Sequence, residues 1–157
     1  MSELLQAIYQ GDKARADELL AADPELDVFE AAAVGRTDRL RELLDEDPGL
    51  ANAWAEDGFQ PLGLASFFGH VDAARLLVER GADVNSASRN DMKVMPLHSA
   101  VATGDPETRY ELAKLLLDNG ADPNARQQDD YTPLMAADQH GDDRLRELLT
   151  VHGAQQT

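Results

Sequence analysis

Apolar residues recur along the chain with the spacing of amphipathic helices, and these helices come in pairs. The second helix of each pair carries adjacent leucines that form an apolar stripe: Leu76-Leu77, Leu115-Leu116 and Leu148-Leu149. The first helices carry small residues, which let neighbouring helices approach closely: Ala65, Ala100, Ala136 and Ala137. A glycine separates the two helices of each pair, at Gly69, Gly104 and Gly141. This pattern predicts an all-α chain.

The helix pairs repeat along the sequence. Three segments match one another: Gln60 to Ala87, Met95 to Arg126 and Thr132 to Ala154. The proline that begins each pair recurs after 35 and then 37 residues, at Pro61, Pro96 and Pro133. Repetition at such a period is typical of a solenoid, in which each unit buries the apolar face of the next.

Local signals place the helix ends. Proline at the first helical position loses no hydrogen bond, and Thr132 before Pro133 can cap its helix. Gln60 and Met95 are poorer caps, so we expect their helices to begin less firmly. A glycine just beyond each second helix is typical of a helix C-terminus, as at Gly81 and Gly120.

The same arrangement extends upstream. The segment VFEAAAVGRTDRLRELLDEDPGLANA predicts a helix pair that turns at Gly35, and ELLQAIYQGDKARADELLAAD predicts another that turns at Gly11. Only DPELD connects these two pairs, which leaves no room for a hairpin loop between them. A terminal repeat must present a polar outer face, and the charged first pair fits that capping role.

The motifs resemble the ankyrin repeat. The residues that carry the resemblance are Thr132-Pro133-Leu134, Pro96-Leu97-His98-Ser99-Ala100, Gly69-His70 and the endings GADVN and GADPN. The resemblance is clear from Asn52 to Ala154 and fainter before that, and it is to the small, stand-alone, bacterial type of ankyrin repeat protein. It implies units of a turn and two antiparallel helices, and a structural role for His98 in ordering the hydrogen bonds of its loop.

We therefore expect an all-α, ankyrin-type α-solenoid of about five helix pairs with three short β-hairpin loops, at 52–60, 85–95 and 124–132. Residues 1–157 would form one domain, divided into 1–26 (the N-terminal cap), 27–51, 52–84, 85–123 and 124–157. Two irregularities interrupt the repeat. The middle loop is two residues longer than the others, and GDPETRYE adds four residues between the helices of the fourth pair. These insertions indicate either a local function or the ordinary tolerance of loops for extra residues.

Composition narrows the class of function. The chain has 157 residues, no cysteine and a formal net charge of −16. Without cysteine there are no disulfides and no thiolate metal sites, which suits a cytoplasmic location. The negative charge disfavours nucleic acid and membrane surfaces as partners, although it also serves solubility alone. We find neither a signal peptide nor an apolar run of bilayer-spanning length.

Candidate chemistry is sparse. The four histidines lack the spacing of a zinc site, and Asp129-Asp130 beside Asn124 lack the spacing of a calcium-binding EF-hand. No phosphate-binding glycine loop and no nucleophile motif is present. We expect no catalytic residue, no metal and no cofactor, and therefore no enzyme.

The resemblance implies a partner-binding surface on the concave side, made by the loop tips and the first helices. By position it comprises Trp54, Glu56, Asp57, Phe59, Phe67, Phe68, Asp91, Met92, Val94, Asp129, Tyr131 and His140. We call its apolar members the aromatic strip: Trp54, Phe59, Phe67, Phe68, Met92, Val94 and Tyr131. Aromatic residues and methionine are enriched at interface centres, and the acidic members would favour a partner with a basic segment.

Alternatives remain open at this point. Phe68 can instead pack beneath the neighbouring hairpin, and Trp54 can fill space beneath its own loop. The leading function is a monomeric, non-enzymatic module that binds an unidentified protein. The second is self-association through the same strip or through the last helix, DRLRELLTVHGA. An enzyme is the third and weakest.

Overall fold

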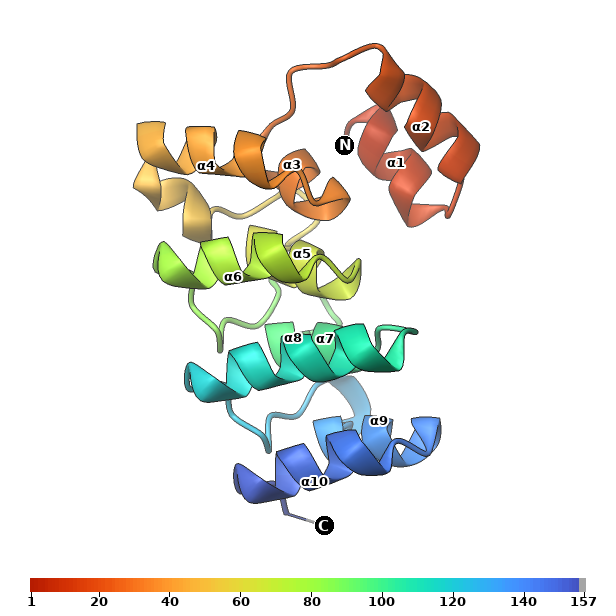
Figure 1. Cartoon of the computed structure of the whole chain (residues 1–157), viewed down its shortest axis with the longest axis vertical. Coiled ribbons are helices and arrows are strands. Elements are labelled where there is room, and N and C mark those ends of the chain that lie inside the picture. Colours follow the sequence, from red (N-terminus) through yellow and green to blue (C-terminus); the bar gives the residue numbers. More distant parts are fainter. Residues whose placement is uncertain (156–157) are drawn as a thin grey trace.

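The computed structural model describes residues 1–155, in which ten α-helices form five antiparallel pairs (Figure 1). Two short 3-10 helices, η1 and η2, precede the third and fifth pairs. The helices are α1 (Glu3–Tyr9), α2 (Lys13–Ala21), α3 (Val28–Val34), α4 (Thr37–Glu46), η1 (Pro48–Asn52), α5 (Pro61–Phe67), α6 (Val71–Glu79), α7 (Pro96–Val101), α8 (Pro106–Asp118), η2 (Gln128–Asp130), α9 (Pro133–His140) and α10 (Asp143–Val151).

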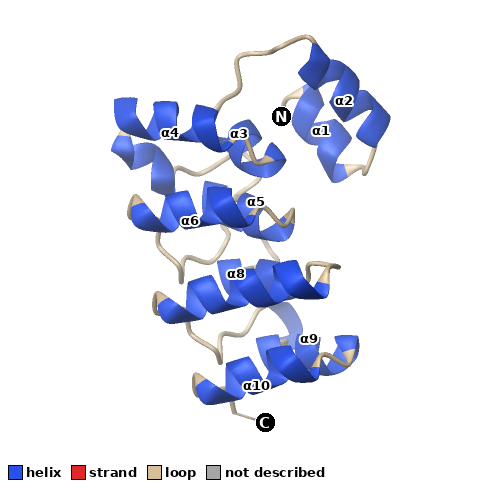
Figure 2. Cartoon of the chain, viewed as in Figure 1, coloured by secondary structure: helices blue, strands red, loops and turns tan. Residues whose placement is uncertain are grey.

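The pairs stack in two rows (Figure 2). The first helices α3, α5, α7 and α9 pack one on the next, and the second helices α4, α6, α8 and α10 form a parallel row. This arrangement confirms the predicted all-α repeat solenoid. Within residues 1–155, none of the helices is both long enough and apolar enough to cross a lipid bilayer.

The core lies between the two rows. Leucines of the second helices are almost completely buried: Leu40, Leu44, Leu77, Leu112, Leu116, Leu145 and Leu149. Each fully buried leucine contributes about 2 kcal/mol of transfer free energy. Alanines of the first helices, such as Ala65 and Ala100, are also buried and allow the close approach within their row. The helix caps follow the sequence: Thr132 accepts a hydrogen bond from the Met135 N–H, whereas Gln60 and Met95 make no side-chain cap.

The three predicted β-hairpins are not supported. Within the described residues no strand forms. One backbone hydrogen bond joins the two sides of each loop, from the N–H of Ala55 to Phe59, of Ser88 to Val94 and of Gln127 to Tyr131, and the other backbone bonds within the loops are local turns at their tips. The reason is that side chains accept hydrogen bonds from loop N–H groups that a β-ladder would need. The Phe59 N–H, for example, donates to Asp57 Oδ1 and the Val94 N–H donates to Ser88 Oγ. The predicted loops are therefore narrow turns.

An asparagine ladder fixes successive repeats in register. The side-chain NH2 of Asn52 donates to the Gly81 carbonyl at 3.0 Å, and its oxygen accepts from the Asp83 N–H at 2.8 Å. The same two bonds join Asn85 to Gly120 and Asp122, and join Asn124 to Gly153 and Gln155. The asparagine of each GADxN ending thus holds the end of the next second helix.

The insertion in the fourth pair lengthens a helix. Helix α8 has 13 residues, whereas α6 has 9, so the four additional residues form about one more turn. That turn carries Arg109, whose guanidinium is buried and pairs with Asp142 of the next unit at 2.7 Å. It also donates to the carbonyls of Thr103 and Gly104. The insertion therefore serves the contact between repeats, which the sequence alone did not indicate.

The N-terminal pair departs from the stack. Helix α1 packs against α3, but the main neighbour of α2 is α1, and the pair lies to one side of α3 in Figure 1 instead of above α4. Only Ala16 of α2 is buried. The connector between α2 and α3 contains Asp23, which has a left-handed φ of 51°. This offset places the end of α1 against residues far away in the sequence.

Candidate protein-binding surface

The loop tips of the third, fourth and fifth pairs join into one row. The Arg89 N–H donates to the Gly58 carbonyl at 2.8 Å, and the Gln128 N–H donates to the Met92 carbonyl at 3.3 Å. Gly58 has a φ of 88°, and a Cβ at this position would lie 2.5 Å from the Arg89 carbonyl oxygen. The close approach of the first two loops therefore requires glycine. The row brings predicted site residues from separate repeats side by side.

An open depression of about 320 Å³ lies between the second and third loops. Its lining includes four predicted site residues and two glutamines: Met92, Val94, Asp129, Tyr131, Gln127 and Gln128. Met92 is 45% exposed, and the Tyr131 hydroxyl donates to Gln139 Oε1. The depression is open to solvent and lies on the row of loop tips, so it can receive a side chain of a partner.

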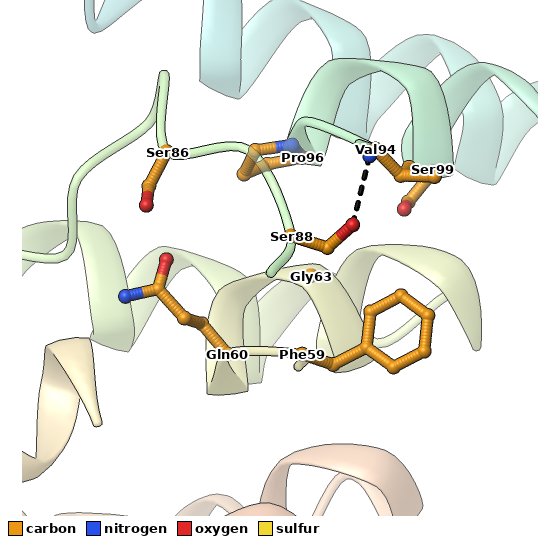
Figure 3. Close-up of a pocket in the computed structure, with 8 residues that line it drawn as sticks. All are labelled: Phe59, Gln60, Gly63, Ser86, Ser88, Val94, Pro96 and Ser99. Carbon is orange, nitrogen blue, oxygen red and sulfur yellow. Dashed lines mark hydrogen bonds between the residues drawn. The ribbon is translucent and has the colours of Figure 1, made fainter. Parts of the chain in front are cut away.

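A second gap lies between the first and second loops but is far smaller (Figure 3). Phe59 and Gln60 border it on one side, and Ser88 and Val94 border it on the other. Its volume is about 10 Å³, which is room for about one water molecule. Phe59 packs against the core here, so it contributes less free surface than we expected from the sequence.

The two adjacent phenylalanines have different environments. Phe67, the last residue of α5, is 54% exposed, whereas Phe68 is half-buried. Their rings meet edge to face with centroids 5.0 Å apart. Phe68 is covered by Tyr9 of α1, whose ring stacks on it with a centroid distance of 6.0 Å and an interplanar angle of 19°. Phe68 thus packs beneath the N-terminal pair, a neighbour that the sequence had not suggested.

Tyr9 is a site residue that we did not predict. Its hydroxyl donates to Asp57 Oδ2 at 2.8 Å, and it remains 37% exposed. Burial, together with the hydrogen bond to the Asp57 carboxylate and its negative charge, raises the pKa of Tyr9 well above its usual value. The only signal in the sequence was an aromatic residue at the end of an N-terminal helix, and nothing indicated where that helix would pack.

The acidic members of the predicted set differ in how accessible their carboxylates are. Asp91 and Asp129 are exposed, and the Glu56 side chain is 93% exposed with its carboxylate 3.4 Å from the Met1 amino group. The Asp57 carboxylate instead accepts hydrogen bonds from the Tyr9 hydroxyl and from the Phe59 N–H. Three carboxylates therefore remain accessible along the loop row.

Two predicted members lie at the margins of the surface. The Arg89 guanidinium covers the ring of Trp54 at 3.9 Å from the centroid, a cation–π contact that leaves Trp54 half-buried. His140 is exposed and is the last residue of α9, just as Phe67 is the last residue of α5. Neither residue therefore offers a large free apolar side chain at the surface.

Buried His98 and half-buried His70 hold neighbouring repeats together. His98 Nδ1 accepts from the Met95 N–H at 3.2 Å, so its Nε2–H donates to the Ala125 carbonyl at 2.8 Å. His70 Nε2–H donates to the Ala33 carbonyl at 2.9 Å. Burial lowers the pKa of both histidines, and the carbonyl contacts only partly oppose it. Both rings therefore bridge between repeats in the neutral form. Among residues 1–155, no three acidic or histidine side chains are grouped closely enough to hold a metal ion.

Comparison with known proteins identifies the repeat. A family model described as ankyrin repeats in three copies matches residues 4–88 and again residues 28–127. Together these matches cover most of the chain, including the offset N-terminal pair.

Curated relatives carry the same repeats within longer proteins. The chain is 41% identical over 59 residues to mouse ankyrin repeat and SAM domain-containing protein 6, covering 38% of this chain and 7% of that protein. It is 34% identical over 91 residues to human DNA-binding protein RFXANK, and this match covers 56% of this chain and 35% of that protein. It is 35% identical over 115 residues to Drosophila E3 ubiquitin-protein ligase Ufd4, and this match covers 73% of this chain and 4% of that protein.

The matched stretch is thus a minor part of each of these relatives. All three relatives are animal proteins, so they do not support the bacterial type that we expected. The repeats themselves match in sequence. The chain belongs to the ankyrin repeat family.

Proposed function

We propose that the chain binds a protein partner along its loop tips and first helices. Ankyrin repeats generally mediate protein–protein interactions, and the family is generally non-enzymatic. The observation that carries the proposal is the exposure of two large apolar side chains of the aromatic strip, Phe67 at 54% and Met92 at 45%. Burying such a side chain in an interface stabilises a complex by about 2 kcal/mol.

The strip has the anatomy of an interface. Phe67 supplies an aromatic anchor on α5, and the depression beside Met92 and Tyr131 can accept an apolar side chain of the partner. Phe59, Phe68 and Tyr131 pack against the core and hold these two points on a rigid frame. We propose that the partner touches both points at once, since either alone would bury too little surface.

We propose a partner with a basic segment. Glu56, Asp91 and Asp129 are exposed on the loop row, and the net charge of −16 would speed the approach of a positive surface. The same charge disfavours nucleic acid, although one relative is called a DNA-binding protein. Duplex DNA should therefore show no binding even at low salt. We also propose a cytoplasmic location, which fits a chain without cysteine.

Self-association is the second candidate. The last helix pair exposes Val151 at 76% and Met135 at 37%, so its outer end offers apolar surface for a second copy. We expect a monomer, because two exposed apolar side chains supply too little surface for a stable interface. Light scattering at tens of micromolar separates the two candidates, and a dimer mass would favour self-association.

The test of the proposal is affinity capture from native lysate with matched variants. The double variant Phe67→Ala/Met92→Ala should bind its specific protein about a hundredfold more weakly, because two anchors of about 1.4 kcal/mol each are removed. Its melting temperature should stay close to that of the wild type. The control is Val151→Ala, which removes an exposed apolar side chain away from the strip. Equal capture by the double variant and the wild type would refute the proposed surface.

A further inference from the structure

The contact between Tyr9 and the binding surface suggests what the surface recognises. We propose that the ring of Phe68 and the carboxylate of Asp57 form a socket for a tyrosine side chain of the protein partner, and that Tyr9 of the chain's own α1 occupies this socket until the partner displaces it. The proposal rests on the proposed function, because the socket lies within the predicted partner-binding set.

The geometry of the socket matches a phenol group. The Phe68 ring provides a flat apolar face at a stacking distance of 6.0 Å, and Asp57 Oδ2 accepts the hydroxyl at 2.8 Å. A phenylalanine could stack but would leave the carboxylate without its donor, and a small polar residue could not stack. Phe67 remains exposed beside the socket and can contact the residues that flank the incoming tyrosine.

The acceptor is held in place before any ligand arrives. Asp57 Oδ1 accepts from the Phe59 N–H at 3.3 Å, which leaves Oδ2 directed to the hydroxyl. The Asn90 side chain donates to the Asp57 carbonyl at 3.1 Å, and the neighbouring Gly58 carbonyl binds the next loop. The socket therefore belongs to the rigid stack, and only its occupant belongs to the N-terminal pair.

The occupant is lightly held. The helices of the N-terminal pair bury fewer residues than those of any later pair: Leu4, Leu5 and Ala7 on α1, and Ala16 on α2. The pair also lies off the row of second helices and is joined to the stack by residues 22–27. Within the described residues, no asparagine ladder joins this pair to the next. Opening of the pair would expose Phe68 and Asp57 without disturbing the contacts among the later repeats.

An internal competitor raises the apparent dissociation constant for the partner in inverse proportion to the open fraction of the chain. A closed state populated to about 90% would weaken binding about tenfold. Replacing Tyr9 by alanine should remove the competitor and so raise the affinity for the partner by the same factor of about ten. Replacing the adjacent, exposed Gln10 by alanine should have no effect, which makes Gln10→Ala the matched control.

The first arm of the test needs no partner. The Tyr9→Ala chain, labelled with ¹⁵N, is titrated with N-acetyltyrosinamide at millimolar concentration while the backbone amide shifts are followed by NMR. Resonances of residues 56–59 and 66–69 should move, and they should move at least about fivefold less with N-acetylphenylalaninamide or in the wild type. Equal responses to the two amides, equal responses in the two proteins, or no response would each overturn the proposal.

The second arm uses the captured protein. Tyr9→Ala should bind it about tenfold more tightly than wild type, Gln10→Ala should bind it as wild type does, and Asp57→Asn in the Tyr9→Ala background should reverse the gain. If Tyr9→Ala leaves the affinity unchanged while Phe67→Ala/Met92→Ala abolishes it, the socket proposal fails and the proposed function stands. If the strip variant captures normally, the proposed function fails, and the amide titration still decides whether the socket accepts a phenol.

Discussion

The stack from α3 to α10 and the N-terminal pair α1–α2 are built from similar helices but are held in different ways. In the stack, leucine and alanine packing is reinforced at every boundary by specific hydrogen bonds, such as those of Asn52, Asn85 and Asn124. The connector DPELD before α3 contains no asparagine, and no loop tip is present there to join the row. The N-terminal pair is instead held by Leu4, Leu5 and the contacts of Tyr9.

Amphipathic helices alone therefore do not define how one repeat is positioned against the next. Apolar stripes bring helices together over a range of positions, whereas directional hydrogen bonds select one. Where the bonding residues recur, the helices stack regularly. Where they are absent, the pair takes an offset position, in which Tyr9 covers the face of Phe68.

The largest effect should come from the buried ion pair of the stack. Burial alone would raise the pKa of Asp142, but the Leu145 N–H and the Arg109 guanidinium outweigh it and hold that pKa below its usual value. Arg109→Ala would leave the carboxylate buried without its partner, so we expect the free energy of unfolding to fall by about 3 kcal/mol. Urea denaturation measures this change.

The control for that prediction is an exposed pair on the same row. Arg75→Ala removes an ion pair with Asp72 that lies in solvent, so it should cost less than about 0.5 kcal/mol. Equal costs for the two substitutions would show that Arg109 does not hold the repeats together.

The next effect concerns the junction of the first two loops. Gly58→Ala would force a Cβ against the Arg89 carbonyl at a left-handed φ, so we expect a loss of about 2 kcal/mol. Gly63→Ala is the matched control, because Gly63 lies inside α5 and its Cβ would meet nothing within 4 Å. It should raise stability by about 0.5–1 kcal/mol, since glycine disfavours helix. Thermal unfolding of both variants gives the sign of each change.

A smaller effect should appear on acidification. The folded pKa values of His70 and His98 lie below 6.5, so below pH 6.5 the unfolded chain binds more protons than the fold does. The stability from these neutral rings is present above pH 6.5 and is lost as the pH falls toward the lowered values. We expect the melting temperature to drop by a few degrees between about pH 7 and about pH 5. His98→Gln should flatten this dependence, whereas His140→Gln, at an exposed position, should not.

The smallest effect on global stability should come from the N-terminal pair. Tyr9→Ala removes one stacking contact and one exposed hydrogen bond, so the free energy of unfolding of the stack should change by less than about 0.5 kcal/mol. Limited proteolysis should nevertheless cut the connector at residues 22–27 faster than in the wild type. Unchanged cleavage, or a large loss of stack stability, would contradict the light attachment of the pair.

The sequence predicted the parts of the fold that depend on repetition. Prolines such as Pro61 and Pro96 begin helices as expected, and the leucine stripes are buried where the 3.6-residue period placed them. It could not predict the loss of the β-hairpins, because loop bonding depends on which side chains compete for the backbone. Nor could it show that the added residues near Arg109 extend a helix.

The places of the candidate residues in the repeat could be predicted from the sequence, but some of their contacts could not. The repeat register gave the places of Phe67 and Met92, and both are exposed. The covering of Phe68 by Tyr9 was not predictable, because it follows from the offset of a pair for which no recurring motif sets the register. The role of the strip in partner binding remains a proposal that the capture experiment tests.

Native-state hydrogen exchange of the wild-type chain gives the most direct view of the difference between the two regions. Amides of α1 and α2 should exchange through a local opening of low free energy, whereas amides of α6 and α8 should exchange only with unfolding of the stack. Tyr9→Ala should reduce protection in α1 and leave α8 unchanged. Equal protection in α2 and α8, insensitive to Tyr9→Ala, would show that the N-terminal pair is an integral part of the stack and cannot uncover the socket.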